Sequence, residues 1–157
     1  MHPSITDIIA RIKAEKEDLG ITLYAPASPK EIFDFENSMG IKLPDDLVKF
    51  YRFSNGFESE EDMFRIIPLE EIIDNIAQPD TYAVEQNDFH FAEFLIYSDM
   101  WTININPVNR NDYHIYNKVE NVITLTNSFP EFLGAFLTGG VFDGLYNWRE
   151  NIKRLTK

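Results

Sequence analysis

The sequence predicts an α+β fold, a single domain in which N- and C-terminal helices flank a central, mainly antiparallel sheet of about four to six strands. Helical hydrophobic periodicity occupies the two ends of the chain, whereas consecutive strand patterns occupy the middle. Strands that follow one another through short turns favour antiparallel pairing. The length of 157 residues suits one domain covering residues 1–157, and no repeat or low-complexity tract divides it.

Helix-capping residues indicate where the helices begin and end. Ser28 with Glu31 is typical of a capping box, and Gly40 suits the left-handed residue that ends such a helix. Pro44, followed by two acids, indicates another N-terminus. The predicted helices are residues 4–20, 28–40, 44–56 and 69–77, a helix from Ser128 to Gly139-Gly140, and a last helix through Trp148.

Strand patterns combine aromatic and β-branched residues with alternating polar ones, most clearly from Trp101 to Asn106. Two of the strands should form a hairpin around residues 98–100. Residues 57–62 should be an acidic loop and residues 78–88 a second loop. The predicted strands are residues 63–67, 91–97, 101–106, 113–116 and 122–125.

The formal net charge of -12 is the first indication of function. Phosphates repel such a surface, so direct binding of nucleic acid is not expected. The same charge favours association with a basic protein, although excess acid also maintains solubility, and both interpretations stay open. The sequence contains no cysteine, no apolar run near the roughly 20 residues of a membrane span and no signal-peptide pattern.

Acidic and aromatic residues are the candidates for contacts with a basic partner. One acidic pair begins a predicted helix, and a longer acidic run follows Asn55-Gly56. Their carboxylates could bind arginines of a partner, or they could complement a helix dipole and remain solvated. Aromatic rings of the sheet are candidates for interface anchors or for the core. The expected partner contacts are Asp45, Asp46, Glu58, Glu60, Glu61, Asp62, Asp99 and Trp101.

No catalytic, cofactor-binding or metal-binding residues are predicted. His2, His90 and His114 do not have the spacing of zinc ligands. Ser98-Asp99 lacks the Gly-x-Ser-x-Gly setting of a hydrolase nucleophile, and Gly139-Gly140 lacks the lysine of a phosphate-binding loop. A run of neighbouring acids gives no evidence of the raised pKa that a general acid requires.

Four motifs follow one another in a fixed order. They are Glu36 with Met39-Gly40-Ile41-Lys42-Leu43-Pro44, Phe50-Tyr51 leading into Ser54-Asn55-Gly56, Ile67-Pro68-Leu69-Glu70-Glu71-Ile72, and Asn127-Ser128-Phe129 with Glu131-Phe132-Leu133. Each alone is also an ordinary cap or turn signal. Together, over residues 28–137, they resemble the SUKH superfamily, which includes the Smi/Knr-type regulator of yeast cell-wall synthesis.

The resemblance implies a function in binding another protein. Bacterial members of the superfamily mostly serve as immunity proteins against toxins delivered by competing cells, and eukaryotic members resemble regulators or scaffolds. We therefore predict a cytoplasmic immunity protein that binds and occludes a cognate toxin, with a basic active-site surface as the expected target and without enzymatic turnover. An intracellular regulatory scaffold or adaptor and a carboxylate-dependent hydrolase are the alternatives.

Overall fold

The computed structural model describes residues 2–60, 63–78 and 84–155, which form an α+β domain around one sheet. Within these residues, seven strands follow one another in the order β1 to β7, and every neighbouring pair is antiparallel. The predicted fold class is confirmed, with one strand more than the expected range. Because each strand pairs with the next in sequence, the whole sheet is a simple meander.

Helices occur at both ends of the described chain and also between the first strands. The helices are α1 (Ile5–Glu15), α2 (Pro29–Met39), α3 (Asp45–Phe53), α4 (Leu69–Ile76), α5 (Phe129–Gly139), the π-helix η1 (Gly140–Tyr146) and α6 (Asn147–Leu155). The strands are β1 (Ile21–Leu23), β2 (Phe57–Ser59), β3 (Phe64–Ile66), β4 (Asp88–Phe94), β5 (Asp99–Ile105), β6 (Tyr113–Asn117) and β7 (Ile123–Thr126).

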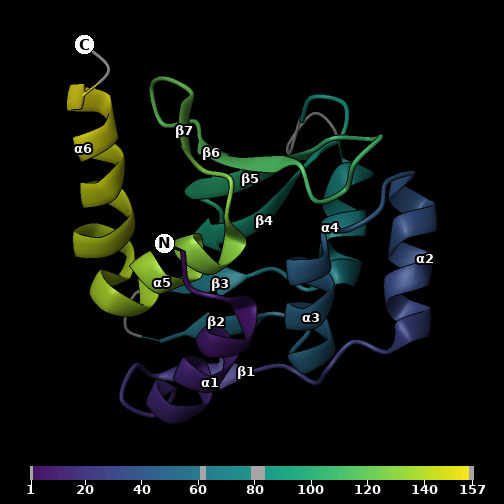
Figure 1. The fold of residues 1–157 in the computed structure, drawn as a ribbon, viewed down its shortest axis with the longest axis horizontal. Helices are drawn as coiled ribbons and strands as arrows, with labels where there is room; N and C mark the ends of the chain where they lie inside the picture. Colours follow the sequence, from purple (N-terminus) through teal and green to yellow (C-terminus); the bar gives the residue numbers. More distant parts are fainter. Residues whose placement is uncertain (1, 61–62, 79–83, 156–157) are drawn as a thin grey trace.

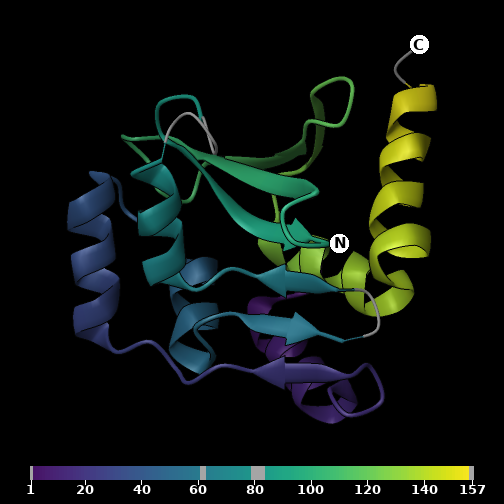
Figure 2. The same cartoon turned by 180° about the vertical axis from the view of Figure 1, so that it is seen from behind.

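The two faces of the sheet are covered differently. Helices α1, α3 and α5 lie over one face, here called the inner face (Figure 1). Viewed from behind, α4 crosses one end of the strands on the opposite, outer face, with α2 beside it (Figure 2). Helix α6 stands at the side, where it packs on η1 and β7. The outer face is therefore the less covered side of the sheet.

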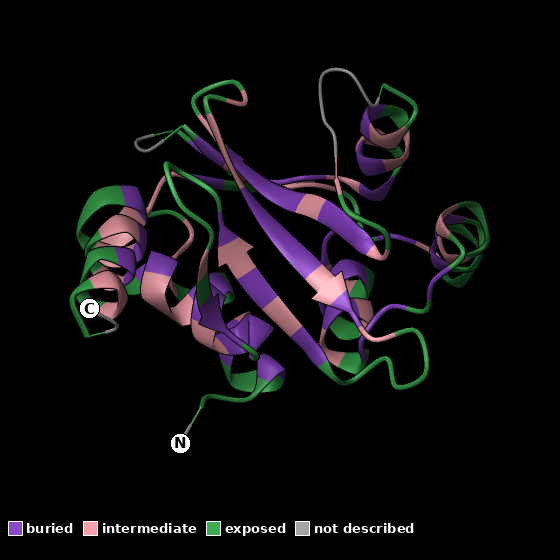
Figure 3. Ribbon diagram, turned by 90° about the horizontal axis from the view of Figure 1, so that it is seen from above, coloured by how far each residue is buried: buried purple, intermediate pink, exposed green. Residues whose placement is uncertain are grey.

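Aromatic rings fill the space between the inner face and α5. Phe64 on β3 stacks on Phe136 with ring centroids 4.2 Å apart and meets Trp101 edge-on at 5.6 Å. Trp101 in turn contacts Phe132. Burial of each such side chain contributes about 1.5–3 kcal/mol relative to its exposure. Buried residues concentrate along these central strands and on the helix faces toward them (Figure 3).

Several local signals act in the way the sequence predicts. The Ser28 hydroxyl accepts from the Glu31 N–H and the Glu31 carboxylate accepts from the Ser28 N–H, so the capping box of α2 is complete. Gly40 ends that helix with φ of +68°. At Gly56, with φ of +96°, a Cβ atom would overlap the carbonyl oxygen of Ile66. Only glycine fits where the chain turns from α3 into β2.

The structure differs from the sequence predictions at several local positions. Residues 57–59 are not loop but strand β2, whose pairing with β1 and β3 is a tertiary feature. Strand β1 and the π-helix η1 were not expected. Helix α3 ends at Phe53, with Ser54 already in extended backbone, and does not continue to the predicted residue 56. The hairpin between β4 and β5 turns at residues 95–98, before the predicted position.

Candidate functional site

A row of side chains, polar except for Met100 at its end, crosses the outer face from β1 to β5. Cross-strand pairing aligns Thr22 with Glu58, Glu58 with Arg65, Arg65 with Glu93, and Glu93 with Met100. Since side chains alternate between faces along a strand, all five point away from α5. The neighbours Phe57 and Phe64 point into the inner core. Strand alternation therefore gathers opposite charges on the less covered side.

Arg65 is the centre of a charged network on this face. Its Nε donates to Glu93 Oε2 at 2.6 Å, and its two terminal nitrogens donate to the Glu71 carboxylate of α4. The Tyr97 hydroxyl donates to the same Glu71 carboxylate, and the Tyr97 N–H donates to Glu93 Oε1 at 3.0 Å. The guanidinium also lies 5.8 Å from the Tyr97 ring. One cation thus joins β3, β4, α4 and the β4–β5 turn.

The network favours the ionised forms of Glu71 and Arg65. Burial by itself raises the pKa of the Glu71 carboxyl. Hydrogen bonds from Arg65 and Tyr97 lower this pKa by a larger amount, so the net shift is downward. Hydrogen bonds to Glu71 and Glu93 raise the pKa of the Arg65 guanidinium against the opposing effect of burial. A general acid needs a raised carboxyl pKa. The Glu71 carboxyl therefore lacks the property expected of the acid in a carboxylate-dependent hydrolase.

Large apolar side chains are exposed beside this network. Ile96 is 80% exposed, Met63 47% and Leu95 43%. The Leu95 N–H donates to the Met63 carbonyl at 3.0 Å, which holds the β4–β5 turn against the β2–β3 connection. Met63, Leu95, Ile96 and Tyr97 have positive φ angles of 53°, 52°, 52° and 62°. This conformation is unfavourable for residues with side chains, most of all for β-branched Ile96.

A hollow of about 420 Å³ lies beside these apolar side chains and is called the outer-face hollow below. Arg65 and Glu93 are buried or half-buried on the sheet and form its floor. Met63 and Ile96 supply apolar walls. The remaining lining residues are Glu58, Ser59 and Glu60. The hollow thus combines exposed aliphatic surface with an acidic border.

The acidic residues expected to bind a partner do not form one group. Glu58 lies on the outer face, where its carboxylate accepts from the Tyr24 hydroxyl at 3.4 Å. Asp45 and Asp46 begin α3, which covers the inner face. Asp45 is paired with Arg110 at 2.6 Å, and burial raises the pKa of Asp46.

Of the other expected contacts, one is buried in the core, one is a carboxylate bound within the fold, and two lie outside the described residues. Trp101 is 1% exposed in the aromatic core, so the expectation of a surface anchor at this position is wrong. Asp99 accepts from the Asn117 side chain at 2.9 Å and from the Tyr146 hydroxyl at 2.6 Å, which joins β5, β6 and η1. Residues 61 and 62, the expected contacts Glu61 and Asp62, lie outside the described residues.

Sequence reasoning missed Arg65, Glu71, Glu93, Met63 and Ile96 as parts of a site. One signal was available: within the predicted strand 63–67, Arg65 occupies the face opposite to Phe64 and Ile66. Its partners, on β4 and α4, are 28 and 6 residues away. No local pattern predicts that a cation will meet those two carboxylates.

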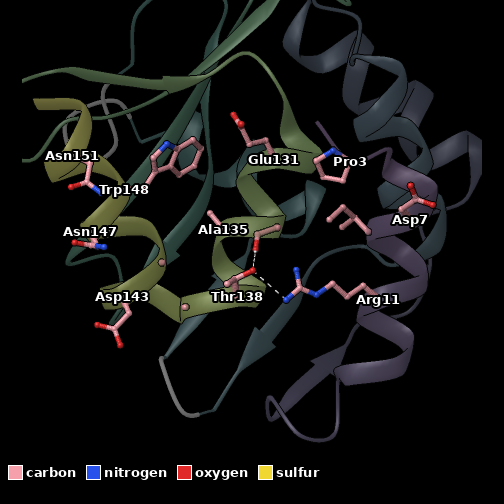
Figure 4. Close-up of a pocket in the computed structure, with 14 residues that line it drawn as sticks. Pro3, Asp7, Arg11, Glu131, Ala135, Thr138, Asp143, Asn147, Trp148 and Asn151 are labelled. Carbon is pink, nitrogen blue, oxygen red and sulfur yellow. Dashed lines mark hydrogen bonds between the residues drawn. The ribbon is translucent and has the colours of Figure 1, made fainter. Parts of the chain in front are cut away.

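A second hollow, of about 590 Å³, lies between α1 and α6 with α5 as its floor (Figure 4). Gly134 and Ala135 keep the floor low, and Trp148 lines it from α6. Arg11 donates to the Thr138 hydroxyl at 3.2 Å across one end. The border of this second hollow carries both acidic and basic side chains, so its charge does not indicate what kind of ligand or partner would bind there.

The described residues contain neither a metal-binding cluster nor a membrane-spanning helix. Across residues 2–60, 63–78 and 84–155, no group of three or more acidic or histidine side chains is arranged to hold a metal ion. Helices in the same ranges are too short or too polar to cross a bilayer. His90, which faces Thr102 at 2.7 Å on the outer face, belongs to a polar cross-strand contact.

Comparison with protein families gives a match over most of the chain. A family profile described as the SMI1 / KNR4 family (SUKH-1) matches residues 26–135, more than half of the chain. The chain belongs to this family. A search of curated proteins finds no match. SUKH-1 membership supports toxin immunity or a related SMI1/KNR4-type function at the level of the family.

The motifs that resemble the SUKH superfamily mainly connect neighbouring elements of the fold through side-chain hydrogen bonds. The Glu36 carboxylate accepts from the Leu43 N–H at 2.7 Å and fixes the turn after α2. The Asn55 side chain accepts from the Leu69 N–H at 3.0 Å, at the start of α4, and donates to Glu70 at 2.8 Å. Apart from Glu71, the residues of the charged network and the outer-face hollow stand outside these motifs.

Proposed function

We propose that this SUKH-1 protein is a cytoplasmic immunity protein that binds a cognate toxin and blocks it by occlusion, without turnover. The main support is family membership over residues 26–135. The formal charge of -12 supports a partner with a basic surface, such as the active site of a toxin that acts on nucleic acid, and disfavours direct binding of nucleic acid by this chain.

The surface of the protein supports binding in preference to catalysis. The outer-face hollow exposes aliphatic side chains beside carboxylates, a combination suited to a protein interface. The carboxylates of Glu71 and Glu93 share the single positive charge of Arg65, and their hydrogen bonds to it hold the surface in place. A rigid surface of this kind lowers the entropy lost on association.

The test is co-expression with the toxin domain encoded beside the gene for this chain. Occlusion predicts that the chain restores growth, forms a stable complex with the purified domain and inhibits it in proportion to the amount added. Inhibition by a substoichiometric amount would instead indicate enzymatic modification of the toxin. Failure to restore growth together with failure to form a complex contradicts the immunity function. Neighbouring genes for envelope synthesis or signalling, with complex formation by their products, support the regulatory scaffold.

A further inference from the structure

We propose that the outer-face hollow receives a lysine or arginine side chain of the partner protein. The aliphatic stem of that side chain packs between Met63 and Ile96, and its cationic head binds the carboxylates of Glu58 and Glu60. The inference rests on the proposed function, because it assigns the surface through which the toxin is bound. It identifies the partner by chemistry: a protein surface on which a basic side chain projects.

The apolar walls explain why a long side chain fits. Met63 and Ile96 line the same hollow, although they come from different connections between strands. Their exposure in one place is not the scattered exposure of single surface residues. Lysine and arginine bury their methylene stems on apolar surface while the charged end remains near polar groups. A volume of about 420 Å³ accommodates one such side chain.

The charges in and beside the hollow select a cation. Among the described residues, four carboxylates lie in or beside the hollow, those of Glu58, Glu60, Glu71 and Glu93, together with one guanidinium, that of Arg65. Three negative charges are therefore in excess. Glu71 and Glu93 already share Arg65, so the carboxylates left to meet a partner are those of Glu58 and Glu60. Charge-assisted hydrogen bonds from a partner's cation are the strongest that these carboxylates can form.

The walls are held in position before any partner arrives. The left-handed backbone at Leu95, Ile96 and Tyr97 is unfavourable for residues other than glycine. It persists because Glu93 accepts the Tyr97 N–H, Glu71 accepts the Tyr97 hydroxyl and Met63 accepts the Leu95 N–H. The strained turn therefore presents Ile96 to solvent in a fixed position. Preorganised contacts of this kind strengthen binding.

The experiment compares variants of the hollow with matched variants elsewhere, using the same purified toxin domain. Glu60→Lys and Ile96→Asp alter the hollow. Asp34→Lys and Val108→Asp make the same changes at exposed positions on α2 and on the β5–β6 turn. We expect each hollow variant to weaken the complex by about tenfold or more, the loss typical of a desolvated charge pair or a central apolar contact. The control variants should change affinity by less than about twofold.

The outcomes separate the inference from the proposed function. If the unaltered chain neither binds nor protects, the proposed function fails and the inference falls with it. If the unaltered chain binds and all four variants bind equally well, the function stands and the hollow is not the contact. Restoration of binding to Glu60→Lys by one Lys→Glu or Arg→Glu change in the toxin domain identifies the inserted side chain.

A measurement on the unaltered complex covers the case in which a variant fails to fold. Hydrogen exchange, followed by mass spectrometry, should show new protection in β2 and in the β4–β5 turn on addition of the toxin domain. Protection confined to α1, η1 and α6, which border the second hollow, would overturn the assignment and place the toxin there instead.

Discussion

The two turns at the ends of β5 differ in backbone strain and in the contacts that hold them. In the β5–β6 turn, Asn106 accepts from the Val108 and Asn109 N–H groups and donates to Asp112, so the hydrogen bonds of Asn106 are local. Beyond these, Arg110 and Asn111 of this turn bond at the surface to Asp45, at the start of α3. The β4–β5 turn has three consecutive left-handed residues. Besides local bonds from Ser98 to Phe94 and Leu95, it is held by Glu71 of α4 and by the Met63 carbonyl. The local turn exposes Val108 without backbone strain, whereas the other exposes Ile96 at the expense of strain.

The difference indicates where a binding surface has been built. Each non-glycine residue in left-handed conformation costs about 1 kcal/mol or more, and such strain is typical of functional sites. A turn that needed only to reverse the chain could use the polar chemistry of the β5–β6 turn. The β4–β5 turn instead depends on the Arg65 network, which also forms the floor of the outer-face hollow. Stability and the proposed binding surface therefore share the same residues.

The largest expected effect follows from removal of the central cation. Arg65→Met leaves the Glu93 carboxylate, which is 3% exposed, without its cation and releases Glu71. Loss of one partner of a buried ion pair lowers the free energy of unfolding by about 3 kcal/mol. Urea unfolding followed by circular dichroism measures the change.

The surface pair of Arg110 and Asp45 provides the control. Arg110→Met should lower the free energy of unfolding by less than about 0.5 kcal/mol, because both side chains are largely exposed. Equal losses in the two variants would show that the Arg65 network contributes no more than a surface ion pair. The distinction between the two turns would then lose its energetic basis.

Elements with local signals were predictable from the sequence. Helix α2 is specified by its own capping box and by Gly40, and the start of α5 is specified by Ser128. Strand β1 and strand β2, with three residues each, contain too little pattern to be recognised. They exist because β2 pairs on both sides and the Tyr24 N–H bonds to Gly56. Their stability is tertiary, and the acidic sequence of β2 suggested a loop.

The candidate site was predictable only in part. Glu58 and Glu60 border the outer-face hollow, and acidic composition alone drew attention to them. Trp101 was misplaced because period-two alternation identifies two faces without showing which face the helices cover. The sequence places Ile96 in a strand because nothing local signals a left-handed turn at a β-branched residue.

A smaller effect should come from the local turn. Asn106→Ala removes two hydrogen bonds accepted by its side chain and one donated to Asp112. These groups are at the surface and regain water, so the free energy of unfolding should fall by about 1 kcal/mol. Thermal unfolding measures the loss, and toxin binding should be unaffected. Weakened binding by this variant would place the β5–β6 turn in the interface.

Glycine substitutions should change stability in opposite directions at the two turns. Ile96→Gly relieves left-handed strain of about 1 kcal/mol or more, which exceeds the added entropy of the unfolded chain, so a net gain of about 0.5 kcal/mol is expected. Val108 does not have a positive φ, and Val108→Gly should lose about 0.5 kcal/mol. Chemical unfolding of both variants measures these two changes in the free energy of unfolding. A loss at Ile96 would mean that its side chain contributes packing that outweighs the strain.

The carboxyls of Glu71 and Asp46 have pKa values that shift in opposite directions. The folded-state pKa of Glu71 is lowered, so its stabilisation is present above the unfolded-state pKa of about 4.3 and is lost as pH falls through the folded-state value. The folded-state pKa of Asp46 is raised by burial, so stability falls as pH rises through the interval above its unfolded-state pKa of about 3.9. Glu71→Gln should therefore flatten the acid-induced loss of stability, whereas Asp46→Asn should steepen it. Unfolding free energies measured at a series of pH values between neutral and acid test both signs, and identical profiles for the two variants would contradict the assignment of Glu71 to the charged network.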